Sequence, residues 1–336
     1  MSITLSSMRI AVAIVRLSLA WSSAQLPSSR RAMCASRLTE PRLHTAISVA
    51  LAALGLALAW LLPGRWQIGW QTAFALSGAM AMSSTAIVAK MLADRLALES
   101  EHGQRVIGVL LLQDLAVVPL LVLIPALGSE PEALLGALTL ALLKGAFLIT
   151  VLLWGGQRAM RWWLTLIARR KSEELFVLNV LLLALGLAWL TDQAGLSLAL
   201  GAFICGVLIS ETEYRVQVEA QIRPFHDVLL GLFFVTIGML LDWRQIVPQW
   251  PLVLLLLTVP VLFKVALVTA IARTLGASGG VALRTGLYLA QAGEFGFVLL
   301  TLSRREGLLP PELFNPVLAA MVLSMVATPF VIMFSN

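Results

Sequence analysis

Apolar runs close to 20 residues long recur along this chain, and short polar links separate them. A helix needs about 20 apolar residues to cross roughly 30 Å of hydrocarbon. The apolar/polar alternation that is typical of strands is absent, so the runs predict spanning helices and not a barrel. About ten spans are expected, near 44–62, 68–92, 105–127, 133–155, 175–191, 195–210, 225–241, 250–272, 281–303 and 315–335.

The scarcity of charge supports an all-α polytopic membrane protein. Only 12% of the residues are charged and 59% are hydrophobic, with a mean hydropathy of +0.91. A soluble domain with so little charge could not cover its surface. No link is long or polar enough to form a second, soluble domain. We therefore divide the chain into an atypical Arg- and Ser-rich N-terminal segment at 1–43 and a transmembrane domain at 44–336.

The net charge of +6 reflects membrane topology and not nucleic-acid binding. Outside the segment 1–43, one set of alternate loops holds about ten arginine and lysine residues and the other holds four. The positive-inside rule then places the first set, and the C-terminus, in the cytoplasm, as for a multi-pass protein of the inner (plasma) membrane. The Trp- and Arg-rich segment 158–171 is expected along the cytoplasmic interface. Cys34 and Cys205 fit no disulfide or metal spacing, and no cofactor motif is present.

A few charged residues fall well inside the expected spans: the acids Asp114 and Glu294, and the cations Lys144 and Lys264. Ionisable residues inside a membrane are costly and usually functional, although they can also be inert structural partners of one another. Asp114 and Lys264 lie roughly 13 Å and roughly 12 Å from the cytoplasmic ends of their spans, so the two charges could meet at one depth. Such a site can exchange a proton for a metal cation.

Two further spans are interrupted by small or polar residues. LSGAMAMSSTAIVAKML (76–92) contains Ser83, Ser84 and Thr85 in a row, and LYLAQAGEFGFVLL (287–300) contains Gln291, Gly293 and Glu294. Such residues can bond to the preceding turn or allow close helix packing. Two interrupted helices in corresponding halves of a chain, however, are a pointer to a transporter binding site. Their half-helix ends would offer carbonyls to a cation.

At these residues the chain resembles the membrane domain of Kef-type antiporters, in the second family of monovalent cation:proton antiporters. The resemblance covers about residues 44–336. It rests on MSSTAIV (82–88), LLLQDLAVVPL (110–120), LGAFICGVLISETEYR (200–215), GLFFVTIGMLLD (231–242) and AQAGEFGFVL (290–299). It implies a sodium/proton-antiporter-like fold of two inverted repeats, with two discontinuous helices. It also implies a dimerisation domain, and hence a homodimer.

The resemblance also assigns roles to individual residues. Asp114 would be the carboxylate that binds the cation (K⁺ or Na⁺) and the proton, and Gln113 stands where electrogenic relatives have a second acid, which implies electroneutral exchange. The helix breaks would contain Ser83, Ser84 and Thr85, and Gln291, Gly293, Glu294 and Phe295. By span order, Lys264 matches a membrane lysine and would be the charge partner. Family members usually carry about three further helices before the span at 44–62 and a C-terminal regulatory domain. An Arg- and Ser-rich segment stands in place of those helices here and no G-x-G-x-x-G motif is present, so a shortened copy is expected.

Three hypotheses for function follow. The favoured one is a secondary antiporter that exchanges K⁺ or Na⁺ for H⁺ around Asp114, without a cofactor. The second is a non-transporting remnant or assembly partner of an antiporter, which the shortened N-terminal region would favour. The third is an intramembrane aspartyl protease, which is disfavoured because the chain has no GxGD motif.

Overall fold

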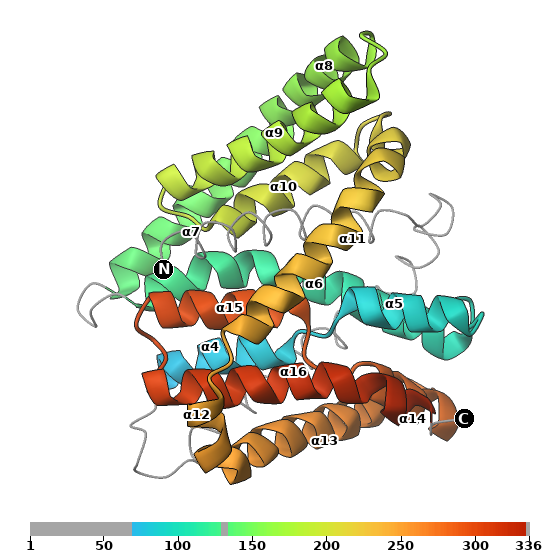
Figure 1. The fold of residues 1–336 in the computed structure, drawn as a ribbon, viewed down its shortest axis with the longest axis vertical. Helices are drawn as coiled ribbons and strands as arrows, with labels where there is room; N and C mark the ends of the chain where they lie inside the picture. The colour runs from blue at the N-terminus through green and yellow to red at the C-terminus, as the bar shows by residue number, and fades with distance from the viewer. Residues whose placement is uncertain (1–68, 129–133, 334–336) are drawn as a thin grey trace. The chain divides into compact units, whose positions relative to one another are not determined.

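The computed structural model describes residues 69–128 and 134–333 (Figure 1). Every regular element among these residues is helical: α4 (Trp70–Ala81), α5 (Thr85–Asp94), α6 (Glu101–Leu127), α7 (Leu134–Val151), the π-helix η1 (Leu152–Gly156), α8 (Gln157–Ala168), α9 (Glu173–Gln193), α10 (Leu198–Ser210), α11 (Arg215–Met239), α12 (Trp243–Ile246), the 3₁₀-helix η2 (Val247–Gln249), α13 (Trp250–Thr274), α14 (Gly279–Tyr288), α15 (Glu294–Arg305) and α16 (Pro311–Met333). The predicted spans from 68–92 onward each coincide with one helix or with two consecutive helices. The segment 1–43 and the predicted span 44–62 lie outside the described residues.

Five helical spans in the described ranges are long and apolar enough to cross a membrane, and the bent α11 makes a sixth. α10 is apolar but shorter, at 13 residues. The two spans that the sequence marks as interrupted are both broken, between α4 and α5 and between α14 and α15. The predicted all-helical class and the two discontinuous helices are therefore confirmed.

Local sequence signals explain where the helices begin and end. The Oγ atoms of serine residues cap α5, α9, α10 and α14 by accepting a hydrogen bond from a backbone N–H in the first turn. Glycines with positive φ follow α9, α13 and α15, namely Gly195, Gly276 and Gly307. Because glycine has no Cβ, it adopts this left-handed conformation without strain and ends a helix cleanly.

The described residues fall into two compact units. The first contains residues 121–128 and 134–239, and the second contains residues 69–120 and 240–333, with the boundary inside α6. All the residues that the sequence predicts for the ion site lie in the second unit. The single transmembrane domain that we expect at 44–336 stays a prediction.

Within the second unit, α15 lies beside α4 and α16, and α13 contacts α14 and α16 (Figure 1). The closest approach uses glycine: a Cβ on Gly296 of α15 would lie 2.3 Å from the carbonyl oxygen of Ala79 in α4. Small residues allow such close backbone contact between membrane helices. The rings of Phe297 in α15 and Phe314 in α16 are also fully buried in this unit.

Within the first unit, α9 packs along α10, and α8 contacts both (Figure 1). The Trp163 indole N–H of α8 donates to the Asn179 side chain over 3.2 Å. Whether α8 lies along the cytoplasmic interface, as we expect from 158–171, stays a prediction. Lys144 lies inside α7, as expected, but its side chain is exposed and forms no ion pair with the described residues.

The chain departs from straight α-helical geometry at α11 and between α7 and α8. α11 bends by 47° between Arg215–Phe225 and Val228–Met239. Pro224 lies just before this bend, where its ring and missing N–H interrupt the helix. Between α7 and α8 the chain forms the π-turn η1, which ends in Gly155 and Gly156.

Candidate ion-binding site

The first helix break, Met82–Ser84, is held open by a glutamine from α6. Met82 and Ser84 have extended backbone conformations. The Gln113 amide accepts a hydrogen bond from Ser83 N–H over 3.0 Å and donates to the carbonyl of Ala81 over 3.2 Å. The Ser84 hydroxyl oxygen then caps α5 by accepting from Ile87 N–H at 3.3 Å. Gln113 thus replaces two of the backbone bonds that a continuous helix would have made.

Asp114, the next residue on α6, is buried beside the same break. Its side chain is 4% exposed. The Thr85 hydroxyl, at the first residue of α5, lies 3.3 Å from both carboxyl oxygens and donates to them. The N-terminal end of a helix carries partial positive charge, so α5 stabilises a carboxylate at this position. Gln113 and Asp114 therefore tie one turn of α6 to the start of α5.

The second break, Leu289–Gly293, crosses the first in direct backbone contact. A Cβ on Gly293 would lie 2.6 Å from the carbonyl carbon and oxygen of Ser83, so only glycine fits at this crossing. The Ser83 hydroxyl donates to the carbonyl of Leu289 over 2.8 Å. On the other side, Ala292 N–H donates to the hydroxyl of Ser324 in α16 over 3.0 Å. The two breaks thus form one crossing that the predicted residues build together.

Lys264 of α13 binds both breaks at once. Its ammonium donates to the carbonyl of Gln291 over 2.8 Å and to the hydroxyl of Ser83 over 3.1 Å. The carbonyls of Met80 and Met82 also lie within hydrogen-bond distance, each at 3.4 Å. Lys264 forms no ion pair with Asp114 among the described residues, so the contact expected from their equal depth is absent. Its positive charge instead sits on the carbonyl ends of the broken helices.

Glu294 and Phe295 begin α15 and are both buried, with exposed fractions of 3% and 2%. Glu294 lies at the positive N-terminal end of α15, as Asp114 lies at that of α5. The two carboxyl groups interact electrostatically. Acidic groups therefore gather at the N-terminal ends of the half-helices, and a cation occupies the C-terminal ends. This arrangement offsets the partial charges that the breaks expose.

The side-chain amide of Gln291 is the part of the crossing whose hydrogen bonds are not satisfied within the described residues. Its side chain is 1% exposed, and neither its amide nitrogen nor its amide oxygen has a hydrogen-bond partner in the described part of the chain. Buried amides are almost always bonded, because each unbonded polar group costs about 1–3 kcal/mol. An unbonded amide inside a site of charged groups is therefore a functional candidate.

Sequence reasoning missed Ser324 and the backbone carbonyls of the breaks. Ser324, like Thr328, interrupts the apolar run of α16, and these hydroxyls were the available signal. The carbonyls of Met80, Met82 and Gln291 leave no trace in residue types, because every residue carries one. Their role depends on where the helices break and on where Lys264 reaches.

The sequence is similar to known transport proteins. The sequence profile of the sodium/hydrogen exchanger transmembrane family matches residues 42–334. A putative K⁺ efflux antiporter KefB of Alkalimonas amylolytica is 38% identical over 295 residues, which cover 87% of this chain and 45% of that protein. The chloroplastic K⁺ efflux antiporter 2 of Arabidopsis thaliana is 40% identical over 265 residues, which cover 77% and 23%. The chain spans less than half the length of either relative.

The glutathione-regulated potassium-efflux system protein KefC of Salmonella heidelberg is 38% identical over 267 residues, which cover 79% of this chain and 43% of that protein. These relatives are named as transporters and not as enzymes. Among solved structures, the sodium proton antiporter MjNhaP1 of Methanocaldococcus jannaschii matches with a TM-score of 0.70. It is 15% identical, and the match covers 99% of this chain and 86% of that one. This likeness confirms the predicted antiporter-like fold.

Proposed function

This chain belongs to the sodium/hydrogen exchanger transmembrane family, and we propose that it exchanges a monovalent cation, K⁺ or Na⁺, for H⁺ across the membrane. One observation carries the proposal: the buried carboxyl of Asp114 lies at the crossing of two broken helices, with Thr85 as its hydrogen-bond donor. A carboxyl takes either a proton or a cation, but not both. Competition between the two ligands for Asp114 couples their movements in opposite directions.

The surrounding residues give this carboxyl a prepared environment. Thr85 supplies a hydroxyl that donates to the carboxylate, and its oxygen lone pairs can face a cation instead. Gln113 fixes the geometry of the first break, so the start of α5 keeps its position beside Asp114. The ammonium of Lys264 occupies the nearby carbonyls of the breaks and leaves the carboxyl of Asp114 to the transported ions.

Exchange is expected to be electroneutral, with one cation for one proton. Gln113 stands where a second acid would add another titrating charge, and its amide is already used for two backbone bonds. Imposing a membrane potential on proteoliposomes should therefore leave the exchange rate unchanged. A rate that follows the potential would contradict this stoichiometry.

We extend the proposal to location and assembly. The loop charges favour the inner (plasma) membrane with the C-terminus in the cytoplasm. The family resemblance favours a homodimer in the bilayer. Cysteine-accessibility labelling at Arg273→Cys and Arg305→Cys would test the orientation, because these positions lie at helix ends on opposite predicted sides of the membrane. Cross-linking in membranes would test the dimer.

The decisive experiment measures cation-driven proton movement in everted vesicles, with K⁺ and Na⁺ tested separately. Adding the transported cation should dissipate the pH gradient that a dye reports. The Asp114→Asn variant keeps the shape of the side chain and removes its charge, so we expect it to abolish the signal. The matched control is Asp94→Asn, because Asp94 lies on α5, the half-helix that starts beside Asp114, but is exposed.

The possible outcomes separate the hypotheses. Loss of exchange in Asp114→Asn with retention in Asp94→Asn would support antiport at Asp114. Exchange that persists in Asp114→Asn would remove Asp114 from the proposed role. A folded unmodified protein that exchanges neither cation would favour the non-transporting assembly partner.

A further inference from the structure

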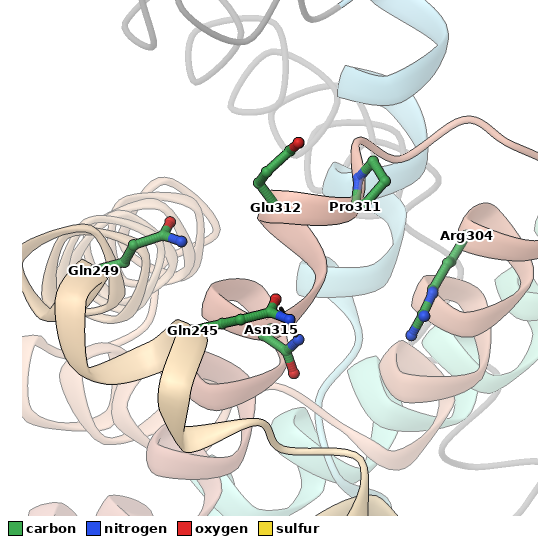
Figure 2. Close-up of a pocket in the computed structure, with 6 residues that line it drawn as sticks. All are labelled: Gln245, Gln249, Arg304, Pro311, Glu312 and Asn315. Carbon is green, nitrogen blue, oxygen red and sulfur yellow. Dashed lines mark hydrogen bonds between the residues drawn. The ribbon is translucent and has the colours of Figure 1, made fainter.

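A polar pocket lies in the second unit, and none of its lining residues belongs to the two helix breaks (Figure 2). Its cavity volume is about 310 Å³, which is at the lower end of the range for small-molecule sites. Three segments form it: α12 with η2, the end of α15, and the start of α16, and the last two follow one another closely in sequence. The lining residues are Gln245, Gln249, Arg304, Pro311, Glu312 and Asn315.

The floor of the pocket is a fixed network of amides. Asn315 is buried, accepts a hydrogen bond from Asp242 N–H over 3.2 Å and donates to the Gln245 side chain over 2.9 Å. Gln245 in turn donates to the carboxylate of Asp242 over 3.1 Å. Figure 2 shows the two amides side by side. These bonds lock Gln245 and Asn315, so the floor is built before any ligand arrives.

The amide of Gln249 remains available. Its Oε1 atom is buried and has no hydrogen-bond partner among the described residues. A buried carbonyl oxygen with no donor is costly, and a ligand with N–H groups would satisfy it. Figure 2 shows this amide reaching toward the pocket from η2.

Two opposite charges line the same pocket without pairing. The guanidinium of Arg304 lies over the ring of Phe314, 4.3 Å from its centroid, which orients the guanidinium plane. Arg304 and Glu312 form neither an ion pair nor a hydrogen bond with each other or with other described residues. A simple anion would be repelled by Glu312, and a simple cation would be repelled by Arg304. A zwitterion satisfies both charges.

Exposed tryptophans mark the depth of the pocket. Trp243 and Trp250 flank the segment that carries Gln245 and Gln249, and their side chains are 67% and 61% exposed. Tryptophan is enriched at the membrane–water interface, at the level of the lipid headgroups. The pocket therefore lies at the depth where zwitterionic headgroups are concentrated.

We propose that this pocket binds a phosphoethanolamine group, supplied by a phospholipid headgroup. The phosphate accepts hydrogen bonds from the Arg304 guanidinium, whose planar fork suits phosphate oxygens. The ammonium donates to the Glu312 carboxylate and to Gln249 Oε1. The bound headgroup joins η2 to the end of α15 and the start of α16, so occupancy stabilises this part of the second unit.

Thermal unfolding of the purified full chain in detergent micelles tests the proposal with three lipids. Phosphatidylethanolamine should raise the melting temperature by a few degrees, phosphatidylcholine less, because its ammonium has no N–H donors, and phosphatidylglycerol least, because it lacks the ammonium. Arg304→Gln and Glu312→Gln should each lose the preference for phosphatidylethanolamine. The matched control is Arg305→Gln, because Arg305 is exposed at the end of the same helix but does not line the pocket.

Soluble O-phosphoethanolamine identifies the source of the group. A shift with the lipid at concentrations where the soluble compound gives none supports a headgroup site, and equal shifts support the same pocket filled from solution. Equal stabilisation by all three lipids would overturn the proposal. So would a preference for phosphatidylethanolamine that survives in both Arg304→Gln and Glu312→Gln.

Discussion

The two helix breaks that cross near Asp114 are built in different ways. The first, at 82–84, is serine-rich, and its own Ser84 caps the helix that follows. The second, at 289–293, ends in Gly293, and α15 begins without a side-chain cap among the described residues. The hydrogen bonds of the first break come largely from Gln113 and Ser84, whereas those of the second come from Ser83, Lys264 and Ser324.

Because of this difference, the second break depends on the first for its position, whereas the first does not depend on the second. The first break is fastened to α6 by the residue next to Asp114, so its geometry and the position of the carboxyl are set together. The second break takes its position from the first, through the bond from Ser83 and the contact at Gly293. Removing a side chain that donates hydrogen bonds to both breaks should therefore loosen the second break more than the first.

The largest effect is expected from Lys264→Met, which removes the ammonium that binds both breaks. Hydrogen bonds to charged groups contribute about 1.5–3 kcal/mol each, and the carbonyls left behind are buried. We predict destabilisation by about 3 kcal/mol, seen as a lower melting temperature. Amide hydrogen exchange should rise more in peptides covering 289–293 than in those covering 82–84, because the first break keeps Gln113 and its Ser84 cap.

Lys90→Met is the matched control for this change, because Lys90 is exposed on α5 and lies outside the crossing. It should leave both the melting temperature and the exchange pattern unchanged. If Lys264→Met raised hydrogen exchange equally in the two breaks, the second break would not depend on the first.

The next largest effect is expected from Gly293→Ala. The added Cβ would meet the Ser83 backbone at 2.6 Å, and that backbone cannot retreat without losing its bond to Gln113. Overpacking of this kind costs about 1–3 kcal/mol, and we expect a destabilisation in the upper part of that range. We also expect the variant to lose cation/proton exchange. Gly280→Ala is the control, because its Cβ would meet nothing within 4 Å. Melting curves of both variants that coincide with the unmodified protein would disprove a tight crossing.

The sequence predicts the helical architecture well because its signals are local. A run of about 20 apolar residues defines a span whatever its neighbours are. Serine caps and following glycines then set the ends of helices such as α9 and α13. The interruptions were also visible, since polar and glycine residues stand inside otherwise apolar spans at Ser83–Thr85 and Gln291–Phe295. The observed breaks, 82–84 and 289–293, begin one or two residues earlier, and Thr85, Glu294 and Phe295 already belong to the helices that follow.

The contacts of the candidate site were less predictable, because they join residues that are distant in sequence. Depth arithmetic placed Lys264 level with Asp114, but it could not give the direction of the side chain. In the structure, the ammonium binds backbone carbonyls of the breaks, which no residue type reveals. The roles assigned to Asp114, Gln113 and the break residues stay predictions until transport is measured.

The smallest effect on stability is expected from Gln291→Leu, although the residue is almost fully buried. Its amide makes no hydrogen bond in the described part of the chain, so an apolar side chain of similar size removes an unsatisfied group. We predict an unchanged melting temperature or a stabilisation of up to about 1 kcal/mol. Cation/proton exchange should nevertheless slow. The unsatisfied amide of Gln291, beside the Lys264 contact, finds its partner only when the transported ion binds or the site rearranges.

Gln113→Leu gives the matched comparison, since it makes the same substitution at a buried glutamine whose amide is fully used by the first break. It leaves Ser83 N–H and the Ala81 carbonyl unsatisfied, which should cost about 2 kcal/mol. Opposite signs of the two stability changes would show that the first break is fastened by its glutamine and the second is not. Destabilisation of similar size in both variants would mean that Gln291 has a structural partner. An unchanged rate of cation/proton exchange in Gln291→Leu would remove Gln291 from the ion pathway.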